Sequence, residues 1–310
     1  MTLHIQHTTH YRYSQPLSHS VHTLHLWPVS GPCQEVIDWS VQVPGTLHEQ
    51  PSVLGNRVHS FTLRTGADTR NIRIQAGGRI RVLGRARFQD GIEIPPGFFR
   101  HASPLAEPHE RMTAWASAVL GGEVPRHPDE STLLRLVSAV SQHVRYRPGN
   151  TGVETTAIEA FDWGLGVCQD QAHVMVAICR GLGWSARYVS GYFHAVNEPE
   201  LASHAWVDVC LDVANRRWVS IDITHSCLID QRHVRLFALD ECVLGRFESI
   251  APEVLASLTQ AERPLRLAPP YAAGARGRRR DLQCAGSRVP RRLRERAGRP
   301  DQRRFLRGSR

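Results

Sequence analysis

Residues 164–173 read Gly-Leu-Gly-Val-Cys-Gln-Asp-Gln-Ala-His, a glycine-rich turn that leads directly into a predicted helix. The helix is predicted from Gln169 to Gly183, because apolar residues recur on one face at positions 172, 175, 176 and 179. Cys168 stands at the start of this helix, where the helix dipole and free N–H groups favour the thiolate. A lone Cys is ordinarily a buried, inert thiol. The setting of Cys168 instead predicts a nucleophile.

A thiolate nucleophile needs a base, and one of the 17 His lies in a predicted hairpin downstream. Pairing strand 204–211 with strand 215–222 puts Val207 opposite Val219 on an apolar side. The same register puts His204 opposite Asp222, with Cβ atoms about 4.5–5.5 Å apart. A carboxylate at that distance orients an imidazole and holds its tautomer. Asp208, a rival partner on the same face, is predicted opposite Trp218 and pointing outward.

The sequence therefore predicts a catalytic triad of Cys168, His204 and Asp222. The thiolate would attack a carbonyl, His204 would protonate the leaving amine, and the acyl group would pass to water or an amine. The backbone N–H of Cys168 would be one oxyanion donor. Trp163 and Trp206 are candidate substrate-binding residues, with core packing as the alternative for both. Helix-start electrostatics or packing is expected for Asp170 and His173.

These motifs resemble a known family, the bacterial transglutaminase-like cysteine proteins. The resemblance rests on four stretches of the core, residues 166–173, 186–192, 204–206 and 218–222, and on residues 7–13 and 26–28 near the N-terminus. It covers roughly residues 1–235 and implies an N-terminal β domain, a papain-like α+β core and the same triad. The sequence departs from the family at Ile223, where Pro is usual, and at Gln171, where an aromatic residue is common.

The rest of the chain predicts three parts. Residues 1–100 form a β-rich, sandwich-like domain, with strands expected at 3–13, 36–43, 58–63 and 71–83, the last broken at Gly77-Gly78. Pro95-Pro96-Gly97 is a predicted linker. Residues 101–245 form the catalytic core, with helices at 108–120 and 129–144, a loop at 147–156, and strands at 186–193, 204–211 and 218–223. Residues 246–310 form an Arg-rich tail.

The tail carries the positive charge. The chain has a formal net charge of +9, with 38 Arg and no Lys, which excludes Schiff-base and phosphate-loop lysine chemistry. Residues 251–310 hold 16 Arg and five acidic residues, which leaves 22 Arg and 24 acidic residues in 1–250. Such a composition predicts disorder. A shifted reading frame near residue 237 would explain this patternless end, and we state it as a hypothesis.

Other features concern compartment and partners. The seven Cys form no C-x-x-C pair, and the N-terminus is unlike a signal peptide, so reduced thiols in the cytoplasm are expected. No apolar stretch is long enough for a membrane span. His4, His7 and His10 alternate along a strand rather than converging, so no metal or other cofactor is predicted. The tail has few aromatic residues, which argues against nucleic-acid binding.

The prediction is therefore a thiol-dependent enzyme acting on peptide or protein amide bonds, a cysteine peptidase or amidase. Transamidation of glutamine side chains onto an amine is the first alternative, because the two reactions differ only in the acyl acceptor. A non-catalytic binding or scaffold protein with a degenerate C-terminus is the second. The sequence leaves the natural substrate, the second oxyanion donor and the oligomeric state open.

Overall fold

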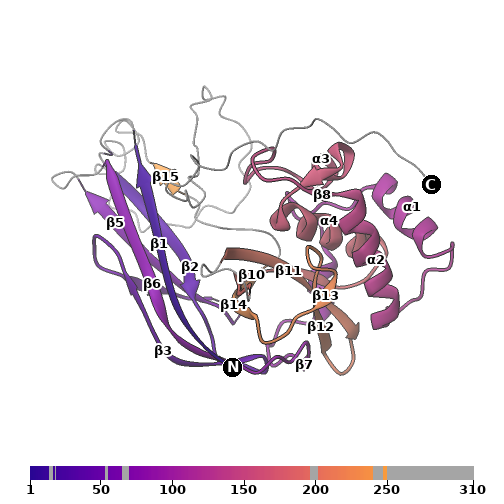
Figure 1. The fold of residues 1–310 in the computed structure, drawn as a ribbon, viewed down its shortest axis with the longest axis horizontal. Helices are drawn as coiled ribbons and strands as arrows, with labels where there is room; N and C mark the ends of the chain where they lie inside the picture. Colours follow the sequence, from indigo (N-terminus) through magenta and orange to yellow (C-terminus); the bar gives the residue numbers. More distant parts are fainter. Residues whose placement is uncertain are drawn as a thin grey trace, which may run out of the picture.

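The computed structural model describes residues 1–13, 17, 19–52, 55–64, 70–195, 202–239 and 247–249. The predicted tail, apart from 247–249, and the end of the predicted core from 240 to 245 lie outside these residues, so the reading-frame hypothesis stays a prediction. Figure 1 shows a layered β region beside a region in which helices lie against a second β-sheet. No helix in the described ranges has the length and apolar character needed to cross a membrane.

The N-terminal region consists of two antiparallel sheets. One has the order β1-β6-β3, with β1 at Thr2–Arg12, β6 at Asn71–Val82 and β3 at Gln34–Gln42. The other has the order β15-β2-β5-β4, with β15 at Phe247–Ser249, β2 at His19–Trp27, β5 at Arg57–Arg64 and β4 at His48–Gln50. The four strands expected within residues 3–83 are confirmed, as is the sandwich-like architecture.

Two details of this region differ from expectation. β2 is missing from the predicted strands, because three His interrupt its apolar alternation, although His22 is itself fully buried against Phe61. The predicted break at Gly77-Gly78 does not interrupt β6. A Cβ on Gly77 would lie 2.5 Å from the Ile5 carbonyl oxygen, so glycine there permits close approach to β1.

The second region is built on a sheet with the order β13-β12-β11-β10-β14. The bounds are Cys227–Leu228 for β13, Arg217–Asp222 for β12, Ala202–Asp212 for β11, Ala186–Phe193 for β10 and His233–Leu239 for β14. The helices are α1 at Glu110–Val119, α2 at Glu130–His143, α3 at Ala157–Trp163 and α4 at Cys168–Gly181. The combination is an α+β fold, as predicted.

Helix α4 is the centre of this region. It packs on β10 and β11 and contacts each of the other three helices. Every residue from Asp170 to Arg180 is buried, so α4 is enclosed on all sides. The predicted α1, α2 and α4 are confirmed within a few residues. α3 was not expected, because seven residues are too few to show helical periodicity, although its capping box of Thr156 and Glu159 is visible in the sequence.

The hairpin of β11 and β12 has a register two residues away from the predicted one. Val207 pairs with Ile221 and Val209 with Val219, so Asp222 does not face His204 directly. The predicted register is wrong because the turn is longer than assumed: β11 continues to Asp212, with a bulge after Cys210. A shift of two residues keeps every side chain on its own face. His204 and Asp222 therefore remain on the same side of the sheet.

The segment between the two regions packs on the second sheet. β7 at Arg87–Gln89 pairs with β12, and the predicted linker opens a short 3-10 helix, η1, at Pro96–Arg100. Phe99 of η1 is buried edge-on against Trp218 at 5.6 Å. The domain boundary at residue 100 stays a prediction, with β7 on its N-terminal side.

Side-chain amides join the two regions at β14, the edge strand of the second sheet. Gln34 donates to the Arg235 carbonyl at 2.8 Å and accepts from the Arg235 N–H at 2.9 Å. Asn56 makes the same reciprocal pair with Ala238, at 2.8 and 3.0 Å. These amides satisfy backbone groups that an edge strand otherwise exposes.

Candidate active site

Cys168 is the first residue of α4 and is partly buried. α3 ends at Gly164, which has a left-handed φ of 63°, and β9 at Leu165–Gly166 then pairs in parallel with β8 at Arg145–Tyr146. A Cβ on Gly166 would lie 2.6 Å from the Cβ of Asp170, so a larger residue would displace the start of α4. The two glycines thus bring the chain tightly into the helix that begins with Cys168.

Asp170 caps this helix and takes no part in the triad. Its Oδ2 accepts hydrogen bonds from the Val167 N–H and the Thr151 hydroxyl, both at 2.7 Å. Burial raises the pKa of Asp170, and these bonds partly oppose the rise. His173 is fully buried 5.0 Å from the Tyr188 ring, and burial lowers its pKa to about 3. Both placements agree with the structural roles expected of these residues.

His204 lies between Asp222 and Cys168. Its Nε2 donates to Asp222 Oδ2 at 2.7 Å, and Cys168 lies close enough to its ring to contribute to the rise of its pKa. Since Nε2 is engaged by the carboxylate, Nδ1 is the nitrogen left for the thiol. Burial alone would lower the pKa of His204, but the hydrogen bonds and negative charges of Asp222 and Cys168 outweigh it and raise the pKa to about 9. The buried Asp222 carboxylate thus favours the protonated form of His204.

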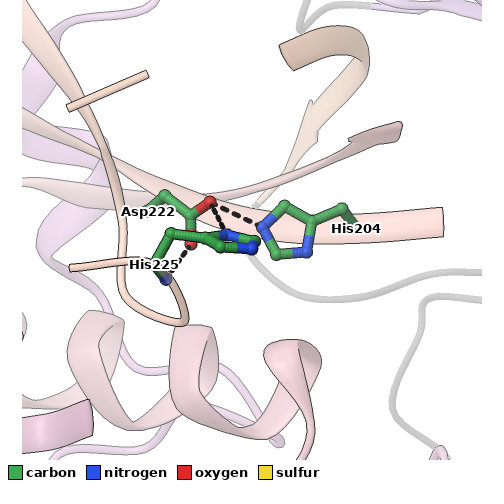
Figure 2. A group of neighbouring side chains, drawn as sticks. All are labelled: His204, Asp222 and His225. Atoms are coloured by element: carbon green, nitrogen blue, oxygen red, sulfur yellow. Dashed lines mark hydrogen bonds and ion pairs between the residues drawn. The ribbon is translucent and has the colours of Figure 1, made fainter. Parts of the chain in front are cut away.

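Asp222 is fully buried and has three imidazole partners (Figure 2 shows two of them). Besides His204, His225 Nδ1 donates to Oδ2 at 2.7 Å and His233 Nε2 donates at 2.9 Å, while the His225 backbone N–H reaches Oδ1 at 3.1 Å. Burial alone would raise the pKa of Asp222, but these bonds hold it far below its usual range. The carboxylate is therefore fixed in orientation and stays ionised.

Sequence reasoning did not identify His225 and His233. His225 follows Asp222 by three residues, a local spacing that could have drawn attention to it. His233 arrives on β14, and nothing in its sequence neighbourhood marks it out. Its Nδ1 lies 3.1 Å from the Asp230 backbone nitrogen and 3.2 Å from Asp230 Oδ1, while its Nε2 donates to Asp222.

Gln171 and Thr224 connect the two elements that carry the site. Gln171, on α4, donates to the Val144 carbonyl at 2.7 Å and accepts from the Thr224 hydroxyl at 2.7 Å. Thr224 lies between Asp222 and His225 in the turn after β12. Gln171, which stands where an aromatic residue is expected, therefore holds α4 at a fixed distance from the turn that follows Asp222.

The two tryptophan candidates lie in different environments. Trp163 ends α3 and is 53% exposed, which is compatible with contact to substrate. Trp206 is fully buried against His204 and His233. It supports the imidazoles from the core, and burial removes it from the surface that a substrate reaches. The suggestion that Trp206 binds substrate is therefore corrected in favour of its alternative, core packing.

Asp208 is also placed differently from its prediction. It points inward, is fully buried, and accepts from Arg187 at 3.0 Å, from Arg235 at 2.7 Å and from the Ser220 hydroxyl. The prediction that it faces outward is wrong, because two arginines from β10 and β14 cover it on this face of the sheet. Asp208 has no contact with His204 and is not its orienting group.

His204, Asp222 and His225 offer ligand atoms within 4.8 Å of one another, a spacing that a metal ion could use. Hydrogen bonds from the two imidazoles to the carboxylate already account for the spacing (Figure 2). The expectation that the site works without a metal stays a prediction.

Comparisons with known proteins agree with this geometry. Residues 3–81 match the family described as bacterial transglutaminase-like N-terminal region, and residues 115–223 match the transglutaminase-like superfamily. Uncharacterized proteins of Mycobacterium tuberculosis and Mycobacterium leprae are 33% identical over 120 residues and 34% identical over 95 residues. These alignments cover 36% and 29% of this chain, but only 38% and 33% of the relatives. The chain thus spans less than two fifths of the length of these curated relatives.

A solved structure supports the fold. A candidate cysteine protease from Cytophaga hutchinsonii is similar with a TM-score of 0.62 and 18% identity, over 80% of this chain and 89% of that one. At this identity the likeness concerns the fold alone. Together with the two family matches, it leads to one conclusion: residues 3–81 match the bacterial transglutaminase-like N-terminal region, and they precede residues 115–223, which match the transglutaminase-like superfamily and have its fold.

Proposed function

We propose that this protein transfers acyl groups from peptide or protein amide bonds through Cys168, His204 and Asp222, and acts as a cysteine peptidase or amidase. One observation carries the proposal. His204 is hydrogen-bonded to the Asp222 carboxylate, and Cys168, at the start of a buried helix, lies close enough to His204 to contribute to its raised pKa. A nucleophile, a base and an orienting group in this order are what acyl transfer needs.

The chemistry divides into two steps. In the first, the Cys168 sulfur attacks the carbonyl carbon, and the oxyanion lies near the N-terminus of α4, where the Cys168 N–H has no partner within the helix. The intermediate collapses to a thioester as the His204 imidazolium gives its proton to the leaving amine. In the second step, an acceptor attacks the thioester and the thiolate leaves.

The acceptor decides between the two enzyme classes. Water gives a peptidase or amidase, and a primary amine gives a transamidase. The match to the transglutaminase-like superfamily keeps the second reaction as an alternative. Peptide hydrolysis and incorporation of a labelled primary amine, measured side by side on the same protein, separate the two.

The test of the triad is the pair Cys168→Ala and Cys227→Ala. Both cysteines are partly buried free thiols, but burial and nearby carboxylates raise the pKa of Cys227 to about 11. We expect Cys168→Ala to abolish both activities and Cys227→Ala to leave them unchanged. Iodoacetamide at neutral pH should label Cys168 ahead of the other cysteines. Full activity of Cys168→Ala would end the proposal, whereas absence of both activities in the folded wild-type protein would favour a non-catalytic binding role.

We further propose a cytoplasmic location and a peptide or protein substrate rather than a nucleic acid or a membrane surface. Each of the five cysteines within the described ranges is a free thiol, which suits a reducing compartment. Fractionation of producing cells should recover the protein with cytoplasmic markers. Recovery with the fluid released by osmotic shock would contradict this location.

A further inference from the structure

We propose that His225 is a second base of the site: it binds the acyl acceptor, water or a primary amine, and takes its proton during attack on the thioester. This inference rests on the proposed acyl-transfer function and assigns the second step of that reaction to a different imidazole from the first.

The hydrogen bond to Asp222 fixes the tautomer of His225. Its Nδ1 carries the proton that it donates to Asp222 Oδ2 at 2.7 Å. Nε2 is then a lone-pair acceptor, and none of the described residues hydrogen-bonds to it. Figure 2 shows this second nitrogen pointing away from Asp222 on the side of the His204 ring. The side chain of His225 is 36% exposed, against 6% for His204 and 0% for His233. Of the three imidazoles, His225 is the one that solvent reaches.

The position of His225 is fixed from several directions. Its ring stacks on Phe193, with centroids 4.0 Å apart and planes at 24°, and its backbone N–H is bonded to Asp222. Thr224, the preceding residue, is tied to Gln171 on α4. These contacts hold the ring 5.1 Å from that of His204. A base held this firmly is preorganised for an acceptor that arrives from the open side of the site.

The charges around His225 suit a proton acceptor. Asp222 faces its Nδ1, His204 faces its ring, and the Arg232 guanidinium lies on Phe193, 5.1 Å from that ring's centroid. A proton arriving on Nε2 places a positive charge directly beside the Asp222 carboxylate, which stabilises it. The same carboxylate thus serves an imidazolium in each half of the reaction.

The step balances as follows. A bond forms between the acceptor oxygen or nitrogen and the thioester carbon while the acceptor's proton moves to His225 Nε2. The carbon–sulfur bond then breaks, and Cys168 leaves as the thiolate beside His204. His225 releases its proton to solvent and His204 takes one up, which restores the starting state. His204 has given its own proton to the leaving amine in the first step.

The experiment separates the two steps with p-nitrophenyl acetate. The burst of nitrophenolate measures acylation of Cys168, and the steady rate that follows measures transfer to water. His225→Asn is the decisive variant, because the asparagine Nδ2 replaces the Nδ1 donor to Asp222 while the base at Nε2 is lost. We expect its burst rate to stay within about twofold and its steady rate to fall about 10²-fold, a general-base contribution. Adding glycinamide as a primary-amine acceptor should show the same loss.

Two further variants control the result. His194→Asn changes the histidine that follows Phe193 and has no role in the site, so both rates should match the wild type. His225→Ala removes the Asp222 donor as well, so the burst should also slow. Equal slowing of both steps in His225→Asn, or no change in either, would overturn the inference. A folded wild-type protein that released no nitrophenolate in either phase would instead refute the proposed function itself.

Discussion

Two carboxylates on one β-hairpin, Asp208 and Asp222, are both fully buried and yet have opposite kinds of partner. Asp208 is surrounded by the arginines of β10 and β14, whose charge is permanent. Asp222 is surrounded by three histidines, whose protons can leave. The comparison teaches that burial alone does not identify the function of a carboxylate. The partners decide whether a buried carboxylate balances permanent charges or stabilises imidazoles that can exchange protons.

The largest effect is expected from removing the charge of Asp222, which with His204, His225 and His233 forms what we call the histidine centre. In Asp222→Asn, the amide would favour the wrong tautomer of His204 and would no longer stabilise its imidazolium. We expect kcat/KM for amide hydrolysis to fall by about 10⁴-fold. The thermal midpoint serves as the control for folding. A loss below tenfold in a folded variant would show that Asp222 is a structural carboxylate like Asp208.

The second substitution removes the charge of Asp208, which with Arg187 and Arg235 forms what we call the arginine centre, and it should lower stability. In Asp208→Asn, Arg235 would lose its carboxylate and Arg187 would keep only Asp90, so buried positive charge would be left without compensation. We expect a loss of about 3–5 kcal/mol in the free energy of unfolding, measured by urea denaturation.

A surface ion pair provides the matched control for Asp208. Asp162→Asn breaks the exposed pair with Arg111, and the expected change is at most about 1 kcal/mol. If the two variants lost equal stability, the arginine centre would not have the structural role that its burial indicates.

The third effect is a pH dependence that belongs to the histidine centre alone. Because its pKa is raised from 6.5 to about 9, His204 contributes stability that is fully present below pH 6.5 and is lost as the pH rises through 9. The expected loss is about 3 kcal/mol across this window, followed by urea denaturation at a series of pH values.

Cys168→Ala is the control for this pH dependence. It removes a side chain that contributes to the raised pKa of His204, so the loss between pH 6.5 and 9 should shrink. An identical pH profile in the variant would mean that Cys168 does not stabilise the protonated form of His204.

The three residues of the predicted triad carry local signals in the sequence: a glycine-rich turn before a helix, and two residues on one face of a hairpin. The apolar pattern of β11 and β12 defines faces but not register, which is why a shift of two residues left the prediction of the dyad intact. The outward placement of Asp208 failed for the same reason, since its burial depends on Arg187 and Arg235 from other strands.

The contact between His233 and Asp222 could not be predicted from the sequence. Its contact with Asp222 exists only because β14 joins the sheet beside β10, and no spacing in the sequence encodes that. His225 is intermediate, since its separation of three residues from Asp222 is a local signal, but only the turn geometry gives it meaning.

The hydrogen bonds from the Gln34 and Asn56 side-chain amides to β14 extend the comparison to the N-terminal region. β14 supplies His233 to one carboxylate and Arg235 to the other, and Gln34 and Asn56 hold its outer edge. The strand that supplies residues to both carboxylates is thus held by residues 201 and 182 positions earlier in the chain. A genetic screen for loss of activity should therefore recover substitutions at Gln34 and Asn56 as well as at Cys168, His204 and Asp222. A core domain expressed without the N-terminal region would expose the unpaired edge of β14 and should aggregate.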